Sequence, residues 1–385
     1  MRSVELFSGC GGLALGTARA GFDHELMIEW NPDAFATLKL NKANSVEHAR
    51  DWPFIREDVR EVDWTSFAGE MDLVAGGPPC QPFSICGKHR GHDDVRDMWP
   101  EAIRAVRELR PRAFLFENVR GLARPAFATY LAWIKAALMD PAAPRRDDEG
   151  HEEHLTRLIR RRTPPEYHVL VLKVNAADFG AAQNRNRVVV AGVHVDLEAD
   201  MLALTPTHSR DRLVWDKWVT GDYWRRHGMR APTTPDADRA LVKRLRVNDD
   251  PPAEQPWRTV RDAIAGLGEP DGKNWHVFQS GARAYTGHTG SVLDEPAKAL
   301  KAGDHGVPGG ENMMVLDDGG VRYFTVREAA RLQGLPDEWS FATSWTESMR
   351  QIGNAVPVQL AEAIGGWMAN TLRSARYVIR ARRAA

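Results

Sequence analysis

The sequence predicts an α/β fold, in which a doubly wound parallel sheet carries helices on both faces. The first observation is that short runs of β-branched and aromatic residues alternate with stretches of helical periodicity over the first half of the chain. The second is composition. The chain of 385 residues is 43% hydrophobic and 27% charged, which fits a globular protein with one large and one smaller domain.

The expected elements follow one another in a regular order up to residue 195. The strands are expected at residues 3–8, 24–30, 71–77, 113–119, 167–176 and 187–195. The helices between them are expected at residues 12–21, 32–41 and 98–111. The connection between the last two strands, "ADFGAAQNRN", favours an antiparallel return at the sheet edge.

The periodicity is lost between about residues 196 and 320, where Gly, Pro, Trp and Arg are frequent. We interpret this change as an inserted smaller domain at 196–340, which includes a connecting helix at 325–334. The larger domain then covers 1–195 and is completed by 341–385, which contains a long terminal helix with an apolar stripe.

Charge and cysteine content limit which compartment and which kinds of binding site the protein can have. The three cysteines are Cys10, Cys80 and Cys86, and neither a signal peptide nor a membrane-spanning run is visible. We therefore expect a cytoplasmic protein without disulfides, and the His and Cys spacing predicts no metal site. The net charge of −1 does not indicate nucleic acid by itself. Two basic runs, 157–168 and 224–230, are either phosphate contacts or solvated faces.

A glycine-rich loop, "SGCGG", joins the first expected strand to the first helix. Such a loop lets backbone N–H groups at a helix N-terminus approach a ligand. Glu29 follows Gly9 by about 20 residues, the spacing at which an acid binds ribose. The pattern indicates an adenosine cofactor, with NAD binding or a purely structural turn as alternatives. Trp30 could stack on adenine or pack in the core, and Asp58 could accept from adenine or cap a turn.

Cys80 follows the strand at 71–77, at the carboxyl edge where open α/β sheets bind ligands. The two prolines before it fix the backbone, which suits a nucleophile. Glu117 ends the next strand at the same edge, and we expect it to be partly buried and able to hold a proton. Gln183, Arg185 and Arg187 alternate, so we expect all three on one face of a strand, where the arginines could bind an anion or an oxygen.

These motifs together resemble the DNA (cytosine-5) methyltransferase family. The quoted segments occur in the family's order and cover nearly all of the chain outside 196–320: "ELFSGCGG", "IEWNP", "GGPPCQPFS", "ENV", "QNRNR", "TVREAARLQGLP" and "QIGNAVPV". The resemblance implies a Rossmann-like S-adenosylmethionine-dependent methyltransferase sheet and a smaller inserted target-recognition domain.

The resemblance also implies roles for matching positions. The catalytic residues would be Cys80, Glu117, Arg185 and Arg187. S-adenosylmethionine would be held by Phe7, Gly9, Cys10, Gly12, Glu29, Trp30, Asp58, Val59, Pro79, Trp99, Asn354, Ala355 and Val356. DNA would be contacted by Gln81, Ser84 and Gln183. Cys86 matches a loop position without chemistry in the family.

The implied reaction flips a cytosine out of duplex DNA, adds Cys80 to C6 and transfers a methyl group from S-adenosylmethionine to C5 within a short sequence. S-adenosylhomocysteine would be the product, and no metal would take part. We expect a monomer in the cytoplasm at the nucleoid, and a restriction endonuclease that acts on the same site is a candidate partner. An RNA cytosine methyltransferase, an NAD-dependent dehydrogenase and an inactive DNA-binding regulator are the alternatives.

Overall fold

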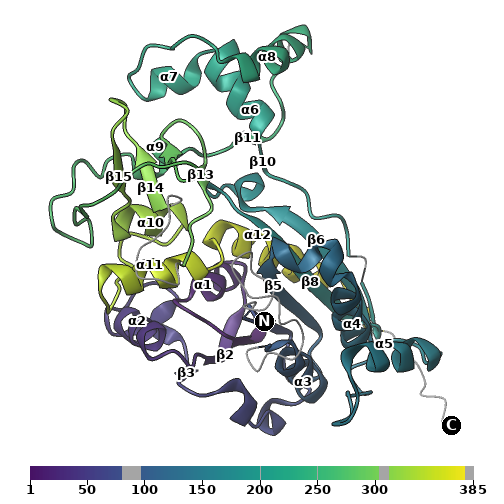
Figure 1. Ribbon diagram of the computed structural model, residues 1–385. Helices are drawn as coiled ribbons and strands as arrows, with labels where there is room; N and C mark the ends of the chain where they lie inside the picture. Colours follow the sequence, from purple (N-terminus) through teal and green to yellow (C-terminus); the bar gives the residue numbers. More distant parts are fainter. Residues whose placement is uncertain (80–96, 200, 249, 303–311, 378–385) are drawn as a thin grey trace. The chain divides into compact units, whose positions relative to one another are not determined.

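The computed structural model describes residues 1–79, 97–199, 201–248, 250–302 and 312–377, and the chain divides into two compact units (Figure 1). Unit 1 comprises Met1–Val174, Asn186–Ala203 and Ala361–Ala385. Unit 2 comprises Asn175–Arg185 and Leu204–Leu360.

Unit 1 is built on a seven-stranded sheet of order β3-β2-β1-β4-β5-β8-β6. Its strands are β1 (Arg2–Leu6), β2 (Asp23–Ile28), β3 (Phe54–Ile55), β4 (Leu73–Gly76), β5 (Ala113–Val119), β6 (Tyr167–Asn175) and β8 (Asn186–His194). The pairs from β3 to β5 are parallel, and β8 runs antiparallel to β5. The predicted α/β class is confirmed, including the antiparallel return.

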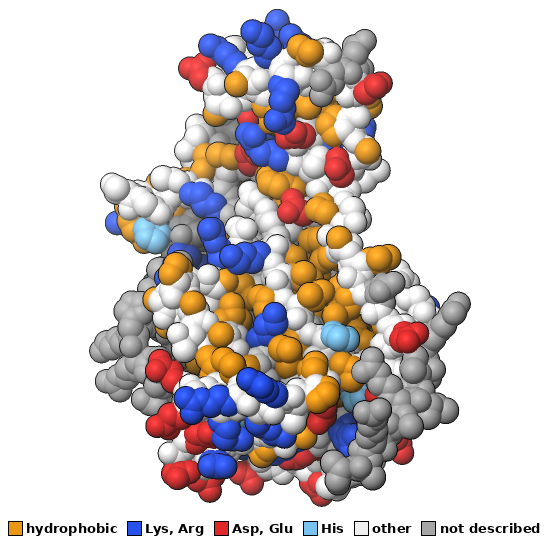
Figure 2. Space-filling model, turned by 90° about the vertical axis from the view of Figure 1, so that its right-hand side faces the viewer, with side chains coloured by type: hydrophobic (Ala, Val, Ile, Leu, Met, Phe, Trp, Pro, Cys, Tyr) orange, Lys and Arg blue, Asp and Glu red, His pale blue; other side chains and the backbone are white. Residues whose placement is uncertain are grey.

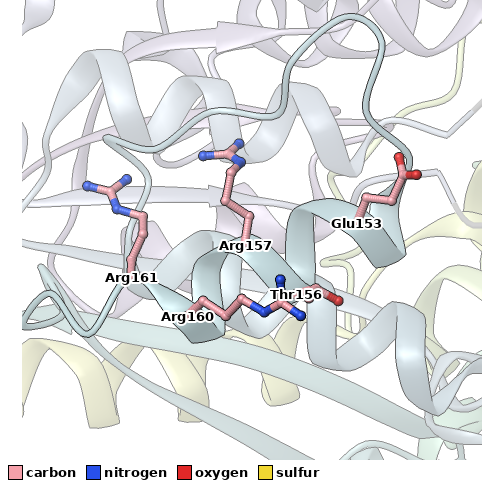
Figure 3. A pocket seen from close by; sticks show the side chains of 5 residues that line it. All are labelled: Glu153, Thr156, Arg157, Arg160 and Arg161. Carbon is pink, nitrogen blue, oxygen red and sulfur yellow. The ribbon is translucent and has the colours of Figure 1, made fainter.

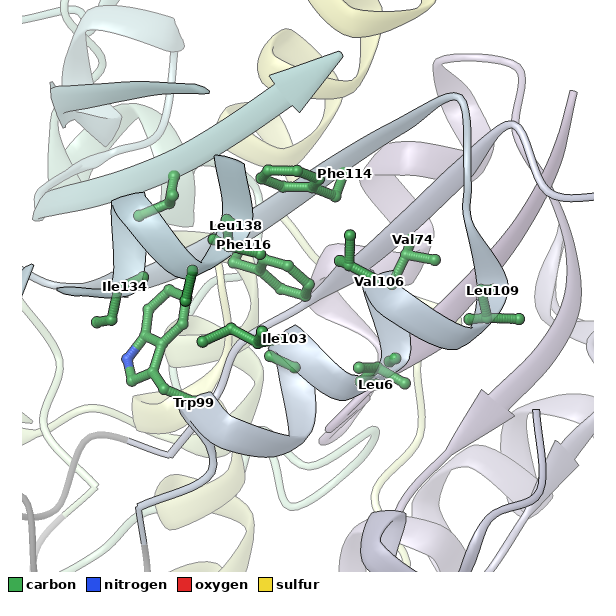
Figure 4. Packing of buried hydrophobic residues seen from close by; sticks show 14 of the residues in the cluster. Leu6, Val74, Trp99, Ile103, Val106, Leu109, Phe114, Phe116, Ile134 and Leu138 are labelled. Atoms are coloured by element: carbon green, nitrogen blue, oxygen red, sulfur yellow. The ribbon is translucent and has the colours of Figure 1, made fainter. Parts of the chain in front are cut away.

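The helices of unit 1 are α1 (Gly12–Arg19), α2 (Pro32–Ala43), α3 (Trp99–Leu109), α4 (Ala128–Met139), α5 (His151–Arg160) and the greater part of α12 (Val358–Ser374). Figure 4 shows α3 and α4 packed on one face of the sheet, where Val74 and Phe116 meet Ile103 and Ile134. Glu5 alternates with the core residues of β1 and so points to the other face. Helices therefore bury the sheet on both sides.

Local sequence explains where these helices begin and how closely they approach. The Asn31 side chain accepts hydrogen bonds from two backbone N–H groups at the start of α2, where Pro32 fixes the first turn. Gly16 on α1 packs against α12 so closely that an added Cβ would lie 2.3 Å from the Cβ of Ala361. Glycine is therefore required at this helix–helix contact.

Unit 2 consists of short elements. Its helices are α6 (Arg210–Val214), α7 (Asp222–Arg226), α8 (Asp236–Asn248), α9 (Val260–Ile264), α10 (Val326–Leu332) and α11 (Trp345–Asn354). Its paired strands are β7 (Gln183–Asn184) with β13 (Ala297–Lys298), β10 (His208–Ser209) with β11 (Gln255–Pro256), and β14 (Met313–Val315) between β12 (Ser291–Val292) and β15 (Val321–Tyr323). Two small apolar clusters built around Trp215 and Trp224 support α6, α7 and α8.

The unit boundaries differ from the predicted domain boundaries at three places, of which the first is that residues 196–203 belong to unit 1. Residues 175–185 join unit 2 because β7 pairs with β13. Residues 341–360 also join it because α11 packs with α10, and because Trp345 of α11 makes a ring contact with Tyr323 of β15. Periodicity in the sequence reports on an element but not on its packing partner, which explains the difference.

The surface of unit 2 carries both signs of charge. Figure 2 shows blue Lys and Arg side chains at the top of the view, over the region of α7 and α8, with red acidic side chains among them. In the basic run 224–230, Arg225 pairs with Asp222 and Arg226 with Asp262. No helix in the described ranges is long and apolar enough to cross a membrane.

Candidate active site

The glycine loop after β1 is held by the acid that ends β2. Phe7, Gly9 and Gly11 all have positive φ, so the loop folds back sharply before α1. The Gly9 N–H donates to Glu29 Oε2 at 2.6 Å, and the Asn31 N–H donates to Glu29 Oε1 at 2.7 Å. Glu29 therefore lies directly beside the glycine loop, and its predicted contact with ribose stays a prediction.

The residues next to Glu29 are accessible to different degrees. Trp30 is 60% exposed, which rules out a core role, and the Arg60 guanidinium lies 5.7 Å from its ring centre. Asp58 caps the short helix at Val59–Glu61 and pairs with Arg60, whose hydrogen bond lowers the pKa of the carboxyl group. Val59 is buried in the core of unit 1.

Two loop residues are buried at the start of α1. Gly12 begins the helix, and Cys10 is 1% exposed. Burial raises the pKa of the Cys10 thiol to about 12, so this cysteine is not a thiolate at neutral pH. Cys10 can line the loop but is unsuited to act as a nucleophile.

Glu117 and Arg187 form an ion pair at the paired ends of β5 and β8. Arg187 Nε lies 2.5 Å from Glu117 Oε1, and the two side chains are only 11% and 9% exposed. The contact has the distance of an ion pair but lacks hydrogen-bond geometry. Across the register, Val119 lies opposite Arg187, which places both charged side chains at one edge of the sheet. A Cβ on Gly77, after β4, would lie 3.7 Å from Glu117 Oε2, so the carboxylate reaches the loop that leads to Cys80.

A second contact fixes that loop. The buried Asn118 side chain donates from Nδ2 to the Pro78 carbonyl at 3.0 Å, and Pro79 is exposed. Asn118 was not predicted, although it lies within the quoted "ENV" segment. The predicted residues Cys80, Gln81 and Ser84 lie outside the described residues, as does Cys86.

The prediction that Gln183, Arg185 and Arg187 share one strand face is wrong. Gln183 belongs to β7, which pairs with β13, whereas Arg187 belongs to β8, which pairs with β5. Arg185 lies between the two strands. The backbone changes partner within five residues, which breaks the alternation on which the prediction depended.

Arg185 and Gln183 are instead buried and bonded inside unit 2. Arg185 donates from Nη1 to the Leu300 carbonyl at 2.8 Å and from Nη2 to the Gly353 and Ala355 carbonyls at 2.5 and 3.1 Å. Gln183 is fully buried and donates to Gln333 Oε1 at 2.6 Å, while the Leu300 N–H donates to Gln183 Oε1. Their contacts are internal, which favours a framework role for both residues over the predicted base contact of Arg185 and DNA contact of Gln183.

The segment at 354–356 begins at Asn354, the last residue of α11. Asn354 is exposed, while Ala355 and Val356 are buried. Gln333 donates from Nε2 to the Ala355 carbonyl at 3.0 Å, so Gln333 and Arg185 both hold this turn. Gln333 was missed, although it lies in the quoted "TVREAARLQGLP" segment.

Trp99, the predicted apolar contact to the cofactor, is a core residue of unit 1. Its indole is fully buried and meets Phe116 edge to face, with ring centres 5.9 Å apart (Figure 4). Met98, the residue before it, is only partly buried. Among the described residues 97–99 of this stretch, Met98 is therefore the apolar side chain that is partly accessible.

An open pocket on α5 contains none of the predicted residues. Figure 3 shows it lined by Glu153, Thr156, Arg157, Arg160 and Arg161. Arg157 is bound by Glu149 and Arg161 by Asp140, so part of the basic run 157–168 is neutralised. Its open, arginine-lined surface lacks the nucleophile and the acid that the predicted chemistry needs. Among the described residues, no group of His, Cys, Asp and Glu could hold a metal ion.

Comparison with known proteins agrees with this geometry. The family described as C-5 cytosine-specific DNA methylase matches residues 1–140 and 148–370. The type II methyltransferase M.PspPI of Psychrobacter is 33% identical, over 97% of this chain and 80% of that protein. M.NgoMIV of Neisseria gonorrhoeae is 30% identical, over 96% of this chain and 98% of that protein.

Solved structures share the fold. A putative DNA modification methyltransferase encoded in an Escherichia coli prophage superposes with a TM-score of 0.58 at 24% identity, covering 97% of this chain and all of that one. The Dnmt2 methyltransferase of Schizosaccharomyces pombe gives 0.56 at 17% identity, covering 97% of this chain and 98% of the other. The family match spans most of the sequence, and the chain belongs to the C-5 cytosine-specific DNA methylase family.

Proposed function

We propose that this protein methylates C5 of a cytosine within a short sequence of duplex DNA, with Cys80 as the nucleophile. The buried Glu117–Arg187 ion pair carries the proposal, because it brings an acid and a hydrogen-bond donor to the loop that leads to Cys80. Membership in the methylase family supports the same reaction.

The residues around the glycine loop fit S-adenosylmethionine. A Cβ on Gly9 would meet nothing within 4 Å, so there is room beside the loop, and the exposed Trp30 indole offers a face to an adenine ring. Glu29 would accept from the ribose, and Met98 replaces Trp99 as the apolar contact. The residues that we propose to hold the cofactor are Phe7, Gly9, Cys10, Gly12, Glu29, Trp30, Asp58, Val59, Pro79, Met98, Asn354, Ala355 and Val356. Bound S-adenosylmethionine supplies an electrophilic methyl group and leaves as S-adenosylhomocysteine.

The protein's own groups activate the cytosine. Carbon C5 is a poor nucleophile, so addition of the Cys80 thiolate to C6 is needed to raise its electron density. After methyl transfer, a base removes the C5 proton, the Cys80–C6 bond breaks and the thiolate leaves. Glu117 holds a proton at N3 and so disperses the charge that builds on the ring. Arg187 donates to O2 and balances the Glu117 charge when no base is bound. Because the ring is stacked in a duplex, the nucleotide must first be extruded, with Gln81 and Ser84 contacting DNA.

Three further residues position this machinery. Asn118 ties the loop after β4 to β5. Arg185 and Gln333 hold the carbonyls of the turn at 353–355, so Asn354 is presented from a fixed backbone. We therefore place Arg185 and Gln183 in the framework and not at the base.

The relatives named as type II methyltransferases suggest a restriction–modification role. We propose that the protein acts as a monomer at the nucleoid and protects sites that a partner endonuclease cleaves. No metal is needed for this chemistry, because the thiolate and the methyl donor supply both reactive groups.

The test measures methyl transfer to duplex DNA and to tRNA with the full chain. Incorporation into DNA is expected, and bisulfite sequencing of DNA from expressing cells would give the site. Cys80→Ala should abolish transfer and keep cofactor binding, and a 5-fluorocytosine duplex should trap a covalent adduct. Incorporation into tRNA alone would contradict the proposal.

A further inference from the structure

A tight turn in unit 2 brings two aromatic rings into tilted contact. The Tyr285 N–H donates to the His288 carbonyl at 3.2 Å, and the His288 N–H donates to the Tyr285 carbonyl at 2.8 Å. The two residues form an antiparallel bridge, and their ring centres lie 4.4 Å apart at an angle of 34°. The turn is therefore a small preorganised element that carries its two side chains together.

The turn geometry depends on a glycine. Gly287 has φ +84°, and Thr286 before it has an ordinary negative φ. This is the pattern of a β-turn that needs glycine at its third position. A Cβ on Gly287 would meet nothing within 4 Å, so the requirement is one of backbone conformation and not of space.

The turn presents its aromatic surface to solvent. Tyr285 is 58% exposed, although a large apolar ring is normally covered. Phe278, earlier in the same irregular stretch, is exposed to the same extent, at 59%. Phe278 lies in no bridge or ring contact with another described residue, so only Tyr285 combines exposure with fixed geometry.

The charges around the turn are positive. Arg283 precedes it and is exposed, with no ion pair to any described residue. Lys298 donates to Thr289 Oγ1 at 2.8 Å, which places a second cation directly after the turn. The acids in the stretch 277–302 are Asp294 and Glu295, which are paired with Arg261 and Lys217. Two cations without an acidic partner among the described residues, beside the exposed Tyr285 ring, match a polyanion that carries planar bases.

We propose that this turn enters a groove of duplex DNA, where Tyr285 and His288 contact bases of the recognition sequence and Arg283 and Lys298 contact phosphates. This inference rests on the proposed function, and it names the residues that would recognise the base sequence of the duplex DNA substrate. A tyrosine ring offers apolar contact to a thymine methyl, and its hydroxyl and the imidazole offer hydrogen bonds to base edges. The cations fix position without carrying sequence information.

The first experiment compares Tyr285→Ala with the matched control Phe278→Ala. Binding of the full chain is measured by fluorescence anisotropy with two labelled duplexes, one carrying the site found by bisulfite sequencing and one with that site scrambled. Tyr285→Ala should lower the ratio of specific to non-specific affinity about tenfold. Phe278→Ala should leave the ratio within about twofold. Arg283→Ala should weaken both duplexes alike and make the salt dependence shallower.

The second experiment tests the turn itself. Gly287→Ala keeps both rings but strains the turn, so the specificity ratio should fall as it does for Tyr285→Ala. Gly281→Ala is the control, because Gly281 also has positive φ and open space but lies outside the turn. Thermal unfolding of each variant shows that the fold is kept.

Each result has one meaning. An unchanged ratio for Tyr285→Ala, or an equal fall for Phe278→Ala, overturns the inference while the methyltransferase function stands. If the unaltered protein methylates no cytosine, the proposed function itself fails before the turn is tested.

Discussion

Replacing Arg187 with alanine tests whether the buried ion pair of the active site is needed for stability. Arg187 and Glu117 are about nine-tenths buried, so solvent screens their interaction little. Removing one partner leaves an uncompensated charge in the sheet edge, which typically costs about 3 to 5 kcal/mol. We expect the free energy of unfolding of Arg187→Ala to fall by about this amount at neutral pH.

The assay is urea denaturation followed by circular dichroism, with hydrogen exchange of β5 and β8 as the local measurement. The double variant Glu117→Gln, Arg187→Ala should recover much of the loss, because it removes the stranded charge. The control is Arg60→Ala. The Arg60–Asp58 pair has the same 2.5 Å separation, but its arginine is 45% exposed. Exposed pairs contribute about 0 to 1 kcal/mol, so Arg60→Ala should change little.

The reasoning is refuted if Arg187→Ala and Arg60→Ala destabilise the protein equally. It is also refuted if the double variant is no more stable than Arg187→Ala alone. Either result would mean that burial does not decide the energetic role of the Glu117–Arg187 pair.

Three other changes have definite expected outcomes. Gly16→Ala should lower the free energy of unfolding by about 1 to 3 kcal/mol in urea titration, because the added Cβ on α1 would collide with Ala361 of α12. The control is Gly366→Ala on α12, where the added Cβ has open space and should cause no loss of stability. Burial lowers the pKa of His24 from its ordinary 6.5 to about 4. Between pH 6.5 and 4, His24 binds a proton in the unfolded chain but stays neutral in the folded protein. The free energy of unfolding therefore falls by up to about 3 kcal/mol as the pH drops from 6.5 to 4. His24→Gln should reduce the dependence of the free energy of unfolding on pH between 6.5 and 4. An equal dependence in the variant and the unaltered protein would contradict this prediction. Trp30→Ala should weaken S-adenosylmethionine binding about tenfold by calorimetry, and unchanged affinity would remove Trp30 from the site.

Much of the fold and part of the site could be read from local pattern. Alternating apolar runs predicted the strands of unit 1, and burial of β4 and β5 follows from their continuous apolar sequence. The same logic places Glu117 at a strand end behind apolar residues, and the structure buries it there. The approach of Glu29 to Gly9 follows from the β-loop-α order of the first elements.

The sequence by itself therefore determined the α/β class, the glycine loop with its acid, and the strand-end position of Glu117, because each depends on residues close together along the chain. Only the tertiary structure decided the partners of Arg185 and Gln183, whose hydrogen bonds reach residues more than 100 positions away. It also decided that Trp99 is core and that 341–360 joins unit 2. A side chain's type sets which bonds it can make, but which backbone carbonyl or ring meets it is fixed by packing between segments that the sequence leaves far apart.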